Sequence, residues 1–142
     1  MVRVALVCSI AVFAGATGVA DAASGADPFR TPSGNIYCAY EHYSFAPVDL
    51  RCEIRSGVKP LPPRPQTCGD ADWGGGYAMR PTGRAHVLCI TDTIYDPRAK
   101  VVGYGTIWRG GGFTCSSRTT GLRCTNRSGH GFFLSRERWR VF

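Results

Sequence analysis

Three histidines and a run of arginines are the residues of this chain best suited to chemistry. His42, His86 and His130 are candidates for proton transfer, because imidazole titrates near neutral pH. In small basic nucleases, two such groups flank a phosphate that cations hold. His130 stands between two glycines beside the arginine-rich segment, with Glu41, Glu53 or His86 as candidate partners. No recognisable acid–base spacing joins these residues, so the sequence predicts no catalytic residue.

The remaining motifs give no sign of a cofactor or a metal. Asp70 and Asp72 form a D-x-D pair, but the further acids of a calcium loop are missing, and a surface turn is the simpler interpretation. The glycine triplets 74–76 and 110–112 do not lead into a helix with Lys-Ser/Thr, so they are not phosphate loops. We therefore expect no cofactor and no metal site.

Positive charge is concentrated at the C-terminal end. The chain carries a formal net charge of +7, and residues 109–142 contain seven arginines but only one acid, Glu137. Arginine presents a planar fork that binds carboxylates and phosphates at two points. We expect the following arginines to form a binding surface: Arg118, Arg123, Arg127, Arg136, Arg138 and Arg140. A solvated surface without a ligand is the alternative.

Six cysteines lie beyond the N-terminal segment: Cys38, Cys52, Cys68, Cys89, Cys115 and Cys124. Zinc ligands usually come in close pairs such as C-x-x-C, and these cysteines are too widely spaced for that. Three disulfides are the expected arrangement, with fifteen connectivities open in principle. Pairing of sequence neighbours is the simplest scheme, and a hairpin would place Cys38 directly opposite Cys52.

The N-terminus is typical of a secretory signal peptide. A positive start is followed by an apolar run over residues 4–14 that is too short to span a bilayer, and then by small residues. We expect residues 1–22 to be this signal, with Cys8 inside it, and cleavage after Ala22. Residues 23–142 would then form a single exported domain with no transmembrane segment, located in the periplasm or outside the cell.

Short alternating runs separated by glycine and proline predict an all-β domain. Leu50, Cys52 and Ile54 share one face of a strand, while Asp49, Arg51 and Glu53 point away. We expect a small sandwich or barrel of about seven to eight short strands, the longest over 101–108. Residues 136–142 fit either a strand or a short helical turn, and the helical turn is slightly favoured.

Several segments together resemble a family of small exported bacterial proteins known only as a domain of unknown function. The resemblance extends from about Phe29 to Phe142. The segments that carry it are Thr31-Pro32-Ser33-Gly34-Asn35-Ile36 with Cys38, residues 50–54, 72–74, Cys89 with 92–93, 104–105, 121–124 and 129–136. The resemblance implies an exported, cysteine-bridged module and assigns no catalytic residue.

We therefore expect a monomeric, non-catalytic exported module that binds an anionic envelope polymer or an acidic protein through its arginine-rich end. Two other functions stay open. One is a small hydrolase of a phosphodiester or a cell-wall glycan that uses His130 and arginines. The other is an inhibitor of a foreign hydrolase, in which the proline-rich segment 57–65 enters a cleft.

Overall fold

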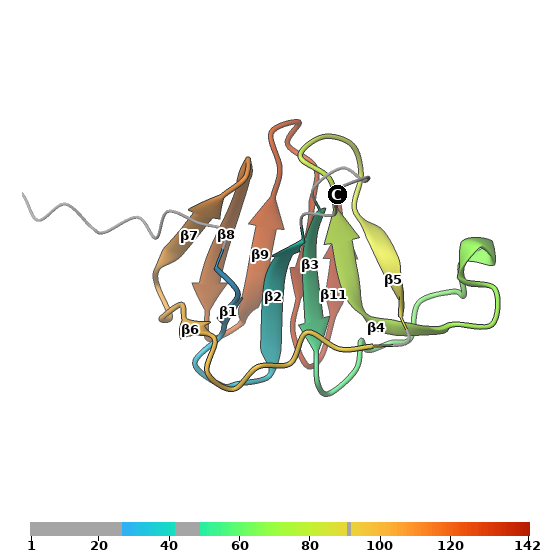
Figure 1. The fold of residues 1–142 in the computed structure, drawn as a ribbon, viewed down its shortest axis with the longest axis horizontal. Helices are drawn as coiled ribbons and strands as arrows, with labels where there is room; N and C mark the ends of the chain where they lie inside the picture. Colours follow the sequence, from blue (N-terminus) through green and yellow to red (C-terminus); the bar gives the residue numbers. More distant parts are fainter. Residues whose placement is uncertain (1–26, 42–48, 91) are drawn as a thin grey trace, which may run out of the picture.

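The computed structural model of this chain describes residues 27–41, 49–90 and 92–142. The expected signal peptide over 1–22, with Cys8, and the candidate residue His42 lie outside these ranges. Within them the chain forms two β-sheets and a single three-residue 3-10 helix, η1 (Gln66–Cys68) (Figure 1). No described helix is long and apolar enough to cross a membrane.

The first sheet has six strands in the order β5-β4-β3-β2-β1-β6. Its neighbouring strands are antiparallel except β1 and β6, which are parallel. The strands are β1 (Phe29–Arg30), β2 (Ile36–Glu41), β3 (Asp49–Ile54), β4 (Asp72–Met79), β5 (His86–Ile90) and β6 (Lys100–Val101).

The second sheet has five antiparallel strands in the order β11-β10-β9-β8-β7. Consecutive strands are neighbours, so each connection is a short turn. The strands are β7 (Ile107–Gly110), β8 (Phe113–Arg118), β9 (Gly121–Thr125), β10 (Gly131–Leu134) and β11 (Trp139–Val141).

The inner faces of the two sheets pack together as a sandwich and form the core. The Phe29 ring of the first sheet lies 4.7 Å from the Trp108 ring of the second, and Tyr77 stacks on Phe132 at 6.0 Å. These aromatic side chains are nearly or fully buried. The predicted all-β fold is therefore confirmed, and of the two expected architectures, sandwich and barrel, it has the sandwich.

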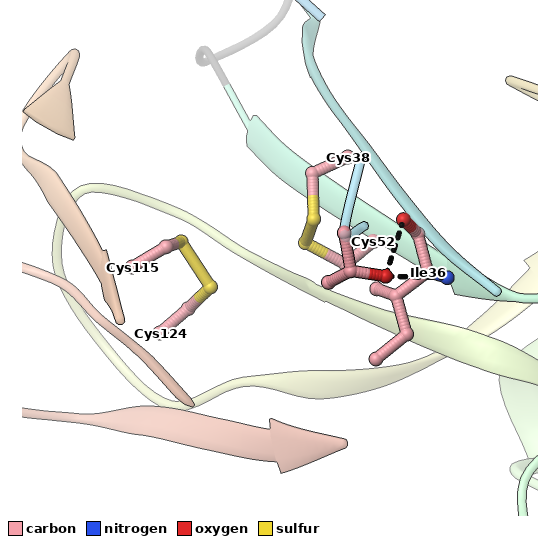
Figure 2. Close-up of a disulfide and its surroundings, with 6 residues drawn as sticks. Ile36, Cys38, Cys52, Cys115 and Cys124 are labelled. Carbon is pink, nitrogen blue, oxygen red and sulfur yellow. Dashed lines mark hydrogen bonds between the residues drawn. A yellow bond between two sulfur atoms is a disulfide. The ribbon is translucent and has the colours of Figure 1, made fainter. Parts of the chain in front are cut away.

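Three disulfides join sequence neighbours. Cys38 and Cys52 are directly opposite on β2 and β3, and Cys115 and Cys124 are directly opposite on β8 and β9. Figure 2 shows these two disulfides, one in each sheet. A third disulfide, Cys68–Cys89, ties η1 to β5. Three disulfides are typical of proteins that fold in an oxidising, extracellular-type compartment.

Residues 101–108 were expected to form one long strand, and this prediction was wrong. The region contains the end of β6 and the start of β7, which belong to different sheets. A turn at Gly103–Thr106 separates them: the Thr106 backbone N–H and hydroxyl both donate to the Gly103 carbonyl, at 3.2 and 2.6 Å. Gly105 has a φ of +84°, which side-chain-bearing residues rarely adopt.

The expected helical turn over 136–142 was also wrong, because this segment contains β11. Ser135 does cap backbone N–H groups, those of Glu137 and Arg138, but it does so within a tight turn between β10 and β11. Pairing with β10 provides hydrogen-bond partners for the backbone N–H and C=O groups of β11, with Phe132 opposite Val141. A single helical turn would leave most of these groups without partners. The structure therefore has eleven described strands, more than the seven or eight expected, partly because β1 and β6 are only two residues long.

Candidate functional site

The outer face of the second sheet carries most of the predicted arginines. Alternation along β8 and β9 sends Cys115 and Cys124 into the core, so Arg118 and Arg123 point outward. The arginine face, as we call it, consists of Arg118, Arg123, Phe133, Arg138, Arg140 and Phe142. Arg123, Phe133 and Arg140 lie directly opposite one another across β9, β10 and β11. All four arginines are exposed.

Cations and rings are interleaved on this face. The Arg123 guanidinium lies 4.3 Å from the centre of the Phe142 ring, and that of Arg138 lies 5.4 Å from the centre of the Phe133 ring. Cation–π contacts of this kind hold a guanidinium in place while its N–H edge stays available for oxyanions. The rings therefore orient the arginines in addition to covering the sheet.

Two glycines make room for the rings. A Cβ added at Gly121 would lie 2.7 Å from the tip of the Phe133 ring, and a Cβ at Gly131 would lie 3.0 Å from the tip of the Phe142 ring. The rings therefore occupy space that side chains would otherwise fill. Gly131 also lets the backbone of β9 approach closely, because the same added Cβ would lie 2.0 Å from the Cys124 carbonyl oxygen.

Two hollows border the arginine face. The side hollow, of about 500 Å³, lies between the rings and the guanidinium groups of the face, next to Trp139. The end groove, of about 660 Å³, is larger and lies where three turns meet: 31–36, 118–121 and 135–138. Arg138 lines both hollows, so they adjoin. Arg118 and Arg136 add two further cations to the end groove.

The arginines of this region have no counter-ions among the described residues. The ion pairs of the described chain involve Arg51, Arg80 and Arg98, and none involves an arginine of 109–142. Glu137 is the only acid lining the end groove, against three arginines. Uncompensated exposed cations on one surface create a positive field that attracts anions.

Arg127, by contrast, lies at the opposite end of β9. It belongs to the turn between β9 and β10, and its backbone N–H donates to the Pro81 carbonyl of the β4–β5 loop. The Asn126 amide fixes the same turn by donating to the carbonyls of Arg80 and Gly83. Five of the six predicted arginines thus border one surface, and Arg127 does not.

The structure does not bring the described histidines together. His86 is exposed on the edge strand β5 of the first sheet, and His130 lies in the β9–β10 turn of the second. Neither side chain has a hydrogen bond or an ion pair with a described residue. No group of three metal-ligating side chains occurs in the described ranges, where Asp70 and Asp72 stand alone. The histidines therefore form no acid–base pair with each other.

Glu53, a candidate partner of His130, is instead part of a buried network that sequence reasoning missed. Its carboxylate accepts hydrogen bonds from Arg51, from the Thr93 hydroxyl at 2.7 Å and from the Ile94 backbone N–H at 3.3 Å. Arg51 also binds the Asp92 carboxylate at 2.9 Å. Arg51 and Glu53 do point away from the core, as predicted, but the connection after β5 covers them.

This network affects the acidity of Asp92. The hydrogen bond and charge of Arg51 hold the pKa of the Asp92 carboxyl below its ordinary value. The network thus fastens the β5–β6 connection to the outer face of the first sheet. It is remote in the fold from the arginine face, which belongs to the other sheet.

The proline-rich segment forms part of an excursion from the sandwich. Figure 1 shows this excursion, with η1 at its far end, extending sideways beyond β4. Trp139 and Trp73 hold its base by donating from their indole N–H groups to the carbonyls of Pro60 and Pro62, at 2.6 and 2.9 Å. Leu61 is 59% exposed. Leu61 therefore lies at the fixed base of the excursion, beside Gly74 of β4, with its side chain partly exposed.

Similarity to known proteins is found at the level of the family. No curated protein and no solved structure matches the chain. A family model described as a family of unknown function, DUF6636, matches residues 7–142. That range is nearly the whole chain and contains every strand described above. The protein therefore belongs to the DUF6636 family, whose function is unknown.

Proposed function

We propose that this protein is a non-catalytic, exported binding module that recognises an anionic envelope polymer or an acidic protein through the arginine face. The observation that carries the proposal is the gathering of Arg118, Arg123, Arg136, Arg138 and Arg140 around two adjoining hollows. None of them has a carboxylate partner among the described residues. An acidic ligand would supply the missing charges.

Export is part of the same proposal. Residues 1–22 would act as a signal peptide, and residues 23–142 would act as a monomer in the periplasm or outside the cell, in a bacterium. The three disulfides support this location, because such bridges persist in oxidising compartments. An anionic envelope polymer would be within reach of the protein there.

The proposal is tested by measuring the affinity of the oxidised protein for polyphosphate and for an anionic polysaccharide. Arg138→Gln/Arg140→Gln should weaken binding of both polymers at least about tenfold at low salt, since each lost charge-assisted hydrogen bond is worth roughly 1.5 kcal/mol or more. Arg84→Gln/Arg127→Gln is the matched control, because it removes two exposed charges at the other end of the sandwich. Equal losses in the two variants would contradict the proposal.

A second candidate function, inhibition of a foreign hydrolase, is supported by the exposed Leu61 side chain at the fixed base of the excursion. A rigid loop with a fixed base loses little entropy when it enters a cleft. In this case Leu61→Asp should abolish inhibition in a panel of glycan hydrolases and proteases, and Arg138→Gln/Arg140→Gln should leave inhibition intact. Absence of inhibition by the wild-type protein across the panel would count against this function.

A further inference from the structure

The end groove offers hydroxyl groups beside its cations. Tyr104, Thr119 and Thr120 line the groove and are exposed, and their hydroxyl groups make no hydrogen bond to any described residue. Other polar groups of the groove already make hydrogen bonds within the protein. The Ser135 hydroxyl, for example, is hydrogen-bonded to the backbone of its own turn. Three hydroxyl groups, each both donor and acceptor, are thus available to a ligand.

The Tyr104 ring also offers an apolar surface. It is 42% exposed and comes from the connection between the two sheets, whereas Thr119 and Thr120 come from the β8–β9 turn. An aromatic ring with a polar tip is suited to a ligand that has both apolar C–H faces and hydroxyl groups. Sugars have both.

The cations of the groove select for an oxyanion on the same ligand. Arg118, Arg136 and Arg138 line it, and planar guanidinium groups bind carboxylate or phosphate at two points. At about 660 Å³, the groove lies within the usual size range of small-molecule sites, roughly 300–1,000 Å³, and has room for a short oligosaccharide.

We propose that the end groove binds an acidic sugar residue of a glycan. The carboxylate or phosphate of the sugar is held by the arginines, its hydroxyl groups are bound by Thr119 and Thr120, and Tyr104 packs against its apolar face. This inference rests on the proposed function and specifies its ligand. The glycan continues past Arg138 onto the arginine face, where further acidic groups meet Arg123 and Arg140.

The arginine face itself favours a glycan over a single-stranded nucleic acid. Proteins bind unpaired bases by stacking them on free aromatic faces. Here each phenylalanine ring has a guanidinium over one face, and its tip fills the space above a glycine. Such rings are poor platforms for bases, whereas the guanidinium edges remain suited to oxyanions.

The test compares three probes that carry equal numbers of negative charges: an oligogalacturonate, a phosphomannan oligosaccharide and a polyphosphate. Thr119→Val/Thr120→Val and Tyr104→Ala should each weaken binding of an acidic glycan about tenfold, on the scale of one or two lost hydrogen bonds or ring contacts. They should change polyphosphate binding less than about twofold. The two glycan arms show whether carboxylate or phosphate is the preferred acid.

Controls keep the outcomes separable. Thr82→Val places the same substitution in the exposed β4–β5 loop and should change nothing, and thermal unfolding checks that every variant folds. If the variants leave glycan binding unchanged, or weaken polyphosphate equally, the inference is overturned while anion binding by the arginine face stands. If the wild-type protein binds none of the three probes, the inference is overturned together with the proposed binding of an anionic polymer.

Discussion

The disulfide between Cys115 and Cys124 joins the two strands that carry Arg118 and Arg123, on the inner side of the sheet. Replacing both cysteines by alanine removes a cross-link between residues nine positions apart. On the chain-entropy model, closing a loop of this length contributes about 2.7 kcal/mol to the free energy of unfolding. Both cysteines are fully buried, so the loss of their sulfur atoms from the core adds to that figure.

We therefore expect Cys115→Ala/Cys124→Ala to lower the free energy of unfolding by at least about 2.5 kcal/mol. Equilibrium urea unfolding of the oxidised proteins measures the change, with the slope m compared to detect altered compactness of the unfolded state. A domain of this size is stabilised by only about 5–15 kcal/mol, so the shift in midpoint should be large. A loss under about 1 kcal/mol, with an unchanged slope, would refute the reasoning.

Three other substitutions test the fold. Asp92→Asn should reduce the loss of stability in acid, because Arg51 lowers the pKa of the Asp92 carboxyl in the folded state. The stabilisation from Asp92 is present above about pH 4 and disappears as pH falls through the lowered value, and unfolding curves from pH 2 to 7 measure it. Gly131→Ala should destabilise the protein by about 1–3 kcal/mol in urea unfolding, because the new Cβ would collide with the Cys124 carbonyl oxygen. Trp108→Ala should cost about 3–5 kcal/mol by the same measurement, since this side chain is 2% exposed.

Local patterns in the sequence were enough to predict an all-β sandwich or barrel and the cysteine pairs. Cys38 and Cys52 fall on the inward side of alternating runs, and a short hairpin places them opposite each other. The 101–108 region could not be predicted in this way, because its pattern continues through a turn and only tertiary packing assigns the two halves to different sheets. Likewise, β11 forms because β10 offers it a partner, which a seven-residue pattern does not reveal.

The sequence predicted the positive charge of the candidate site but not the shape of its groove. Clustering of arginines in 109–142 pointed to the arginine face, yet Arg127 lies at the other end of β9. The end groove depends on three turns that are far apart in the sequence, so Tyr104, Thr119 and Thr120 carried no signal of their own. Strand order in the second sheet brings the 118–121 and 135–138 turns together, and packing of the two sheets adds the 31–36 turn.

The salt dependence of polyanion binding tests the central claim most directly. Each arginine–oxyanion contact releases bound counterions, so the logarithm of the affinity should fall linearly with the logarithm of salt concentration, by roughly 0.7–0.9 per contact. Between 50 and 200 mM salt, we predict a slope for Arg138→Gln/Arg140→Gln that is shallower than wild type by about 1.5, and a wild-type slope for Arg84→Gln/Arg127→Gln. A wild-type affinity that does not change with salt, or the same slope in all three proteins, would contradict the assignment of the arginine face as the binding site.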